Sequence, residues 1–304
     1  MNDTINFITF LNELRTEFDR VSPTKRMLIG SAMGTNPAVI KNYKGTEPYI
    51  DYLLLMTYDY SGSWGDGGHL APLYASGNMD PQFNCDAALR NTLDIGYPVN
   101  KIVMGLPLYG RGWKKIVPKD PSAPIFGTSV AGPADSFSGS AGEPGLSSWR
   151  HIKPIIGTNG FVQYFDQTAQ ATYIASPTGE VWSFDDESTI KIKTTYAMNK
   201  NLIGIMFWEL SDDVRTGNGL VSSAIQVINN LDSNIKGEIK GEPKGDKGEP
   251  KGDKGELGGD KGELKGDKGD KDNSKKITIT IENFKDEPIV INSGEKMIFI
   301  VENV

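Results

Sequence analysis

The sequence predicts an α/β fold in which buried parallel strands alternate with helices. Four short apolar runs carry few charges, as expected of strands buried on both faces of a parallel sheet. These runs are residues 27–33, 49–60, 101–113 and 202–213. Helical patterns follow or separate them around residues 81–95, 186–200 and 219–231. A strand that alternates with a helix favours a parallel sheet with right-handed crossovers.

The chain opens on an amphipathic helix. Its apolar residues share one stripe of a helical period, namely Phe7, Phe10, Leu11, Leu14 and Phe18. Asp3 or Thr4 has the side-chain oxygen that caps a helix start. We therefore expect a helix directly at the amino terminus.

The alternation stops between about residues 114 and 182. This stretch is rich in Gly, Pro, Ser and aromatic residues and contains two strand-like pieces, FVQYF and EVWSF. We expect a small α+β subdomain inserted between a strand and its helix.

Composition excludes several kinds of partner. The formal net charge is -7, and the lysines are interleaved with acids, which does not suit a nucleic acid. The single cysteine, Cys85, excludes an internal disulfide, and two histidines without metal-ligand spacing argue against a metal site. No stretch is long and apolar enough to span a membrane, no export signal is visible, and no cofactor motif occurs.

The carboxyl-terminal part has a different composition. A seven-residue Gly-Lys-acid unit repeats within residues 236–276, and its alternating Gly spacing of three and four breaks the one-in-three rule of collagen. We expect a collagen-like but disordered linker. Residues 277–304 alternate apolar and polar around a turn at 292–294 and resemble the opening strands of a cupredoxin-like sandwich, without a copper ligand set.

Three strand ends carry paired side chains of the type that grips a sugar. In a (β/α) barrel, functional side chains lie at the carboxyl ends of strands, where residues i and i+2 share a face. The pairs are Met56 with Tyr58, Tyr109 with Arg111, and Met206 with Trp208. Asp59 adds a carboxylate, and Trp64 in the GSWGDGG loop adds a flat apolar face. Aromatic platforms beside a few hydrogen-bonding groups suit a carbohydrate.

A structural reading of the same residues stays open. Met56 and Met206 taken alone are typical of a core, and Arg111 has possible ion-pair partners in Asp59 and Asp212. His69 and His151 are interpreted as surface or packing histidines without a catalytic role.

At these strands the sequence resembles a known family. LLLMTYDYSGSW with HLAPLY resembles the sixth-strand signature of family 18 glycoside hydrolases (chitinases), and KIVMGLPLYGRGW resembles the seventh. SFDDESTIKIKTTYAMNKNLIGIMFWEL resembles the last helix and the eighth strand. The resemblance implies that residues 1–235 form a partial (β/α)8 TIM barrel, strands five to eight, with an α+β insertion after strand seven. The natural setting of such enzymes implies an extracellular or particle-surface location.

The resemblance also implies roles for the site residues. Tyr58 would hydrogen-bond the N-acetyl group of a sugar at the cleavage subsite, with Trp208 as its floor. Met56, Asp59, Tyr109 and Arg111 would line that subsite, and Trp64 would serve the leaving-group side. The implied ligands are chitin or N-acetylglucosamine oligosaccharides, with Tyr58 and Asp59 as auxiliary groups and no complete catalytic set.

The catalytic motif of the family does not occur in this sequence. The family's fourth strand carries D-x-x-D-x-D-x-E, whose Glu protonates the glycosidic oxygen in a substrate-assisted reaction. No such motif occurs in the sequence. The acids Asp185, Asp186, Glu187 and Glu209 do not stand in for it, because three resemble a helix start and Glu209 is out of alternation with Trp208. We therefore expect a truncated, inactive chitinase-like module.

Two other readings stay open. One is a chitin-binding or adhesive surface protein on a repeat stalk, and the other is a gene fragment without a function of its own. A four-strand unit leaves two open parallel edges, so we expect self-association through them.

Overall fold

The computed structural model describes most of the chain up to residue 239 and three short strands beyond it. The described residues are 2–77, 79–137, 143–239, 277–278, 290–291 and 297–300. The chain divides into two compact units, residues 1–229 with 295–304, and residues 230–294. The repeat within 240–276, the turn at 292–294 and most of the cupredoxin-like segment lie outside the described residues.

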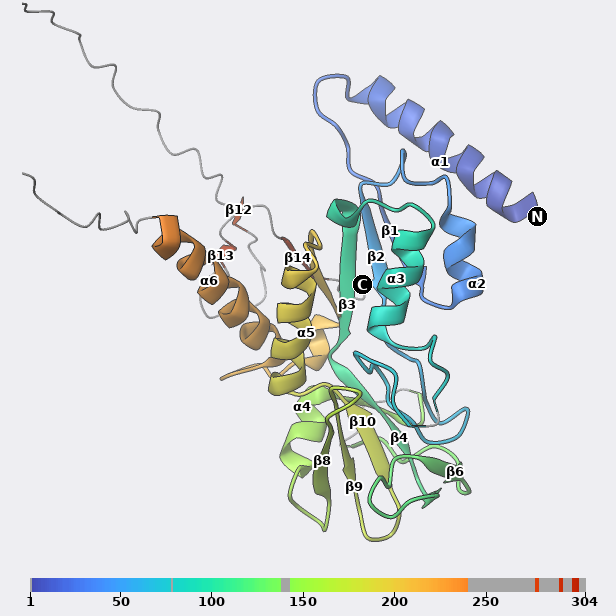
Figure 1. Cartoon of the computed structure of the whole chain (residues 1–304), viewed down its shortest axis with the longest axis vertical. Coiled ribbons are helices and arrows are strands. Elements are labelled where there is room, and N and C mark those ends of the chain that lie inside the picture. Colours follow the sequence, from blue (N-terminus) through green and yellow to red (C-terminus); the bar gives the residue numbers. More distant parts are fainter. Residues whose placement is uncertain are drawn as a thin grey trace, which may run out of the picture. The chain divides into compact units, whose positions relative to one another are not determined.

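A parallel sheet forms the centre of the first unit (Figure 1). Its strand order is β1-β2-β3-β11-β14, with strands at Gly30–Gly34, Tyr52–Met56, Ile102–Pro107, Gly204–Trp208 and Met297–Ile300. Every residue of β3 is buried, as are Gly204 to Phe207 of β11. The four predicted apolar runs each overlap one of β1, β2, β3 and β11, with β1 extending one residue past its run, and the parallel pairing of these strands is confirmed.

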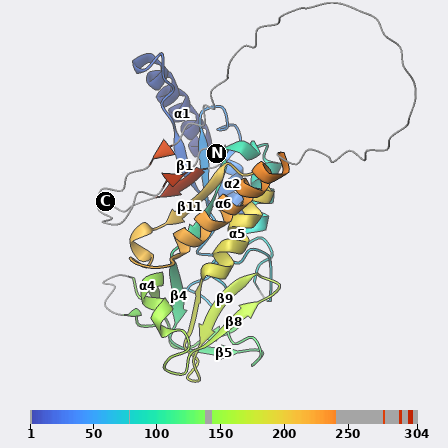
Figure 2. The same ribbon diagram turned by 90° about the vertical axis from the view of Figure 1, so that its left-hand side faces the viewer.

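Helices connect these strands. They are α1 (Asn2–Val21), α2 (Pro37–Ile40), α3 (Cys85–Asp94), α4 (Trp149–Ile152), α5 (Glu187–Asn199) and α6 (Leu220–Ile239). Short 3-10 turns lie at Lys41–Tyr43, Val99–Lys101, Lys153–Ile155 and Leu210–Asp212. The start of α6 lies beside α5 in both views (Figure 2). Among the described residues, none of these helices combines the length and apolarity needed to cross a membrane.

Side chains fix where the longer helices begin. The side chain of Asn84 accepts the backbone N–H of Ala87 at the start of α3. At α5 the Asp186 carboxylate accepts the N–H of Thr189, and the Thr189 hydroxyl accepts the N–H of Asp186 in return. This reciprocal capping box sets the direction in which the chain leaves the insertion.

The insertion is an antiparallel sheet of its own, below the parallel sheet in Figure 1. Its order is β7-β4-β10-β9-β8, with strands at Leu146–Ser148, Tyr109–Trp113, Val181–Phe184, Ala171–Ala175 and Val162–Asp166. A separate two-stranded hairpin joins β5 (Ile116–Pro118) to β6 (Gly127–Ser129).

The predicted run 101–113 is two strands and not one. After Pro107 the chain stops pairing with β11, and β4 pairs instead with β10 and β7. The insertion sheet therefore starts at Tyr109, five residues before the boundary expected near 114.

The edge of β11 is covered, which corrects the expectation of two open edges. Strand β14 pairs with it in parallel, with Gly204 opposite Met297 and Phe207 opposite Ile300. The short strands β12 (Ile277–Thr278) and β13 (Val290–Ile291) pair antiparallel with each other. The helix α6 also continues to Ile239, past the boundary expected at residue 235.

A buried lysine ties α5 both to the residues just before that helix and to the loop after β2. Lys193 is fully buried, and its Nζ donates to both carboxylate oxygens of Asp185 at 2.6 Å and to the carbonyl of Ala71. All the charge of this lysine is thus compensated inside the protein. Removing one partner of such a pair leaves an uncompensated buried charge.

We expect Lys193→Met to lower the free energy of unfolding by about 3–5 kcal/mol, since the Asp185 carboxylate would lose its partner. The matched control is Lys191→Met, two residues away on the exposed face of α5. This variant should change the free energy of unfolding by less than about 0.5 kcal/mol. Urea denaturation followed by circular dichroism measures both. Equal stability of the two variants would contradict the ion-pair assignment.

Candidate functional site

Four of the predicted site residues meet in one hydrophobic cluster at the carboxyl ends of the parallel strands. Tyr58 and Tyr109 are buried members of the cluster, and Met56 and Trp208 pack against it half-buried. Met206 is also a buried member, which supports its reading as a core residue. The strand-end rule therefore brings these side chains to one place, as expected of a barrel mouth.

A glycine on β3 makes room for Tyr58. A Cβ at Gly105 would lie 2.9 Å from Tyr58 Cε1 and 2.4 Å from the carbonyl oxygen of Leu55. Neither distance is tolerated by real carbon atoms, so any larger residue at this position would displace the ring. Tyr58 then meets Tyr109 edge to face, with ring centroids 6.2 Å apart.

Arg111 and Asp59 form a bidentate ion pair next to this cluster. Arg111 Nε donates to Asp59 Oδ1 at 2.9 Å, and Arg111 Nη2 donates to Asp59 Oδ2 at 3.1 Å. The arginine side chain is nearly buried, whereas the carboxylate is about one third exposed. Asp59 has φ of 58°, a left-handed conformation that aspartate tolerates better than most residues. The pair joins the end of β2 to β4, and it selects Asp59 over Asp212, the other partner considered from the sequence.

The guanidinium of Arg111 also holds two aromatic rings. Its Cζ lies 4.9 Å from the centroid of Trp64 and 5.5 Å from that of Tyr109, within cation–π range. Glu143 Oε1 lies 2.8 Å from Arg111 Nη1 and adds a second carboxylate. Trp64 remains 61% exposed, so its ring is held in place but open to a ligand.

The phenol groups of the site stay protonated at neutral pH. Burial and then the negative charge of Asp59 raise the pKa of Tyr58 well above its ordinary value. The same two causes, burial first, raise the pKa of Tyr109. Both hydroxyls therefore keep their protons, and the Tyr109 hydroxyl is already directed at Asp59.

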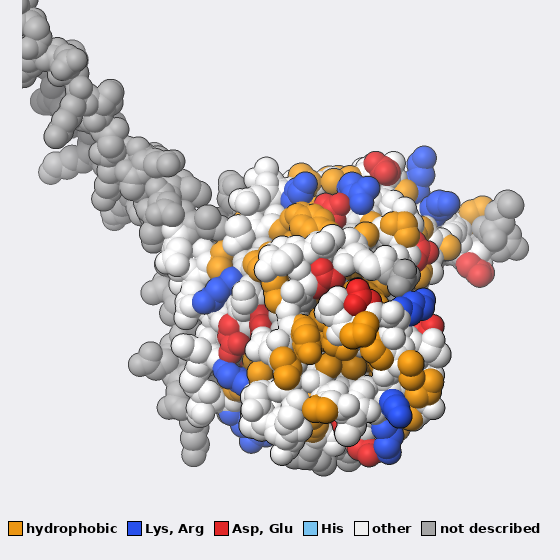
Figure 3. Space-filling view, turned by 60° about the horizontal axis from the view of Figure 1, so that its bottom comes forward, with side chains coloured by type: hydrophobic (Ala, Val, Ile, Leu, Met, Phe, Trp, Pro, Cys, Tyr) orange, Lys and Arg blue, Asp and Glu red, His pale blue; other side chains and the backbone are white. Residues whose placement is uncertain are grey.

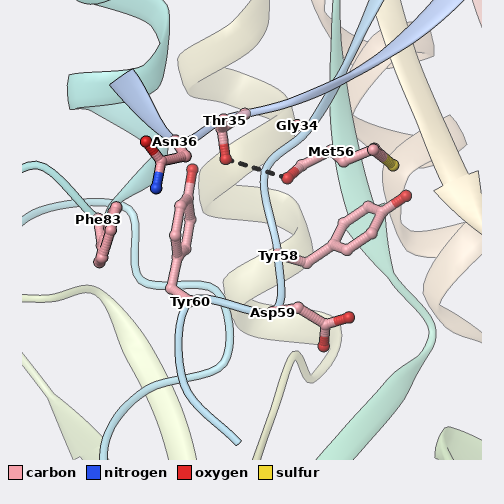
Figure 4. A pocket seen from close by; sticks show the side chains of 8 residues that line it. All are labelled: Gly34, Thr35, Asn36, Met56, Tyr58, Asp59, Tyr60 and Phe83. Atoms are coloured by element: carbon pink, nitrogen blue, oxygen red, sulfur yellow. Dashed lines mark hydrogen bonds between the residues drawn. The ribbon is translucent and has the colours of Figure 1, made fainter. Parts of the chain in front are cut away.

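A pocket of about 320 Å³ extends the site toward the end of β1. Its lining residues are Gly34, Thr35, Asn36, Met56, Tyr58, Asp59, Tyr60 and Phe83. Figure 4 shows the Thr35 hydroxyl bonded to the Met56 carbonyl, at 3.2 Å, with Tyr60 beside Asn36 and Phe83 on the side away from the Tyr58 ring. Tyr60 and Phe83 stack with centroids 6.2 Å apart.

Sequence reasoning missed the residues that β1 contributes. Thr35 and Asn36 directly follow β1, one residue after the apolar run 27–33, so the same strand-end rule that found Tyr58 applies to them. They were overlooked because neither is aromatic or charged.

The carboxylates near the site are already engaged. Asp185 pairs with Lys193, Asp186 caps α5, and Glu187 Oε1 accepts from Lys153 at 2.5 Å. Glu209 follows Trp208 across a cis peptide bond and accepts the hydroxyl of Ser211. These contacts leave one oxygen, Glu209 Oε2, buried without a hydrogen-bond partner among the described residues.

His69 packs against Phe126 and Tyr173 of the insertion core, and His151 is half-buried on α4. His69 is completely buried, and its Nε2 lies 3.0 Å from Asp166 Oδ2. Burial lowers the pKa of His69, although the hydrogen bond to Asp166 opposes the shift. The sequence left open whether His69 is a surface or a packing histidine, and its complete burial fits a packing histidine. In the described part of the chain, no group of three or more His, Cys, Asp or Glu residues is arranged to hold a metal ion.

Comparison with known proteins is consistent with this geometry. The family model described as glycosyl hydrolases family 18 matches residues 1–213. Chitinase A1 of Niallia circulans is 30% identical over 229 residues, covering 69% of this chain and 31% of the relative. Probable chitinase 2 of Drosophila melanogaster is 32% identical over 230 residues, covering 71% of this chain and 45% of the relative. The chain spans about a third of the length of the first three curated relatives, namely 30%, 31% and 38%.

Solved structures match over a similar stretch. A chitinase of Bacillus thuringiensis has a TM-score of 0.67 at 28% identity, covering 74% of this chain and 40% of that one. The Group IV chitinase of Ostrinia furnacalis, solved in complex with allosamidin, has a TM-score of 0.66 at 27% identity, covering 77% and 63%.

Asp59→Asn tests the ion pair that arranges the site. We expect a loss of about 1–2 kcal/mol in unfolding free energy, because the nearly buried Arg111 would lose its bidentate partner and keep only Glu143, while solvent screens part of the effect. Asp66→Asn is the matched control, since among the described residues Asp66 accepts a single bond, from the backbone N–H of Ser129 at 3.3 Å. The role given to the pair would be contradicted if urea denaturation showed Asp66→Asn to be as unstable as Asp59→Asn, or less stable.

Proposed function

Because this chain belongs to glycosyl hydrolases family 18, we propose that its strand ends bind N-acetylglucosamine oligomers, the units of chitin. The observation that carries the proposal is the gathering of Trp208, Tyr58, Asp59 and Arg111 at one sheet end. A half-exposed indole beside protonated phenols and a charged pair offers both an apolar face and hydrogen-bonding edges. A sugar ring has the complementary surfaces.

Each residue then has a distinct task. Trp208 stacks on the apolar face of the sugar at the central subsite, and Tyr58 donates its phenolic proton to the acetamido carbonyl. Asp59 receives the acetamido N–H at its exposed oxygen while Arg111 holds the carboxylate in place. Trp64, held over the same guanidinium, provides a platform for the neighbouring unit.

Met56 and Tyr109 complete the walls of the subsite. Met56 closes it on the side of the 320 Å³ pocket, and Tyr109 supports the Tyr58 ring edge to face. The structure of the Ostrinia furnacalis Group II chitinase domain in complex with an N-acetylglucosamine pentamer, 25% identical to this chain, supports the choice of ligand.

We assign the four parallel strands β1, β2, β3 and β11 to strands five to eight of a (β/α)8 barrel. Their parallel order, with an antiparallel insertion between β3 and β11, supports this assignment. It makes Met56, Tyr58 and Trp208 residues of the barrel mouth. Tyr109 and Arg111 then come from the first strand of the insertion.

Binding without cleavage is the activity we propose for these residues. The family reaction needs a protonated Glu from D-x-x-D-x-D-x-E, and the printed sequence contains no such motif. Loss of a general acid alone costs about 10²–10⁴ in rate. Binding needs no proton transfer, so the remaining groups retain affinity, which we place near the millimolar range, or about 4 kcal/mol.

The 304-residue chain should bind chitotetraose without releasing a fluorophore from N-acetylglucosamine oligomer substrates. Tryptophan fluorescence titration should give a saturable response that Trp208→Ala weakens about tenfold or more, because the stacking surface is lost. Tyr58→Phe should weaken binding about threefold to tenfold, as expected for one hydrogen bond.

Two controls make this result specific. Tyr74→Phe alters an exposed tyrosine outside the site and should leave the affinity unchanged. Cellotetraose, which lacks the acetamido group, should bind the wild type more weakly than chitotetraose does. Its affinity for Tyr58→Phe should equal its affinity for the wild type. Turnover that survives both Tyr58→Phe and Asp59→Asn would contradict the site assignment.

A further inference from the structure

A second pocket, of about 450 Å³, lies on the insertion and shares no residue with the site at the strand ends. Its walls come from β8, β9, the loop 119–126 and the loop around Ser76 and Gly77. The volume is within the range of about 300–1,000 Å³ that holds small ligands. Figure 3 turns the insertion toward the viewer and shows hydrophobic side chains gathered on this side of the molecule.

The floor of this pocket is aromatic and rigid. Tyr164 and Tyr173 are direct cross-strand partners of β8 and β9, and their rings stack at 5.0 Å with an interplanar angle of 8°. Tyr173 and Phe126 belong to the buried core of the insertion, and Tyr164 packs against that core half-buried. A ligand that stacks on Tyr164 would therefore order few flexible side chains, which lowers the entropic cost of binding.

Free polar groups surround this floor. No described residue forms a hydrogen bond with the hydroxyls of Tyr164 and Tyr173 or with the side chains of Gln167 and Lys119. Gln167 and Lys119 are exposed. Each of these groups is thus available to the hydroxyl of a ligand.

The charges in the pocket favour a neutral ligand. Lys119 and Asp120 are neighbours of opposite sign, and both line it. Asp166 is committed elsewhere, since its carboxylate faces His69 Nε2 at 3.0 Å and accepts from Ser76 Oγ at 2.5 Å and from the N–H groups of Thr168 and Ala169. An anion would meet the carboxylates, and a cation would meet Lys119.

A smaller hollow shares lining residues with this pocket and is also lined by the loop of the strand-end site. It measures about 190 Å³ and is lined by Ser61, Asp66, Gly67, Met79, Lys119, Phe126 and Gly127. Lys119 and Phe126 belong to both hollows. The loop between Ser61 and Gly67 carries Trp64, which is the exposed platform of the first site.

We propose that the Tyr164 pocket is a second carbohydrate-binding site, which takes a pyranose ring of a neutral oligosaccharide. The apolar face of the sugar lies on Tyr164, and its hydroxyls bond to Gln167, Lys119 and the phenol groups. The identity of that sugar as N-acetylglucosamine rests on the proposed function of the strand ends. Binding at the pocket itself is independent of Trp208.

Fluorine NMR of the whole chain labelled with 3-fluorotyrosine tests the pocket directly. The Tyr164 and Tyr58 resonances are assigned from Tyr164→Phe and Tyr58→Phe. Titration with chitotetraose should shift both resonances saturably in the wild type. In Trp208→Ala the Tyr164 shift should persist with its apparent Kd changed by less than about twofold, while the Tyr58 shift is lost.

Variants at the pocket complete the test. Gln167→Ala should weaken the Tyr164 response about threefold to tenfold, as expected for one hydrogen bond, without altering the Tyr58 response. Val162→Ala, an exposed change on the same strand, should alter neither. A Tyr164 resonance that does not move while Tyr58 saturates would overturn the second site and leave the first intact. A Tyr164 shift without any Tyr58 shift would support the pocket and refute the proposed function of the strand ends.

Discussion

The ion pair between Arg111 and Asp59 joins the two sheets on which the site is built. Asp59 follows the parallel strand β2, whereas Arg111 lies on β4 of the insertion, and two hydrogen bonds hold the two groups together. The guanidinium also lies over Trp64 and Tyr109 and pairs with Glu143, so four aromatic or acidic side chains, with Asp59, contact one cation. Bidentate geometry fixes orientation as well as distance, which an isolated lysine would not do. The insertion is therefore part of the binding surface.

The site residues at the ends of the parallel strands could be predicted from the sequence. Tyr58 and Trp208 both stand at the ends of apolar runs, and the rule that parallel strands place their carboxyl ends together brought them to one cluster. The four parallel strands and the start of α5 at Asp186 were predictable for the same reason, because buried strands and capping residues leave strong local patterns.

Non-local contacts were not predictable. Nothing in the run 101–113 shows that pairing changes after Pro107, since that depends on which strands lie beside it. The parallel pairing of Met297–Ile300 with β11 joins segments far apart in the chain. Likewise the burial of His69 goes with its contact to Asp166, which lies 97 residues later in the sequence, on β8 of the insertion. Each case depends on tertiary context that short-range periodicity does not contain.

A structure of the chain crystallised with chitotetraose tests the central claim most directly. The account predicts electron density for a sugar ring over Trp208, with its acetamido group within hydrogen-bonding distance of the Tyr58 hydroxyl and the Asp59 carboxylate. The Arg111 to Asp59 pair should remain bidentate in that complex. Density confined to other surfaces, with the end of β11 free of sugar at a concentration that saturates binding in solution, would contradict it.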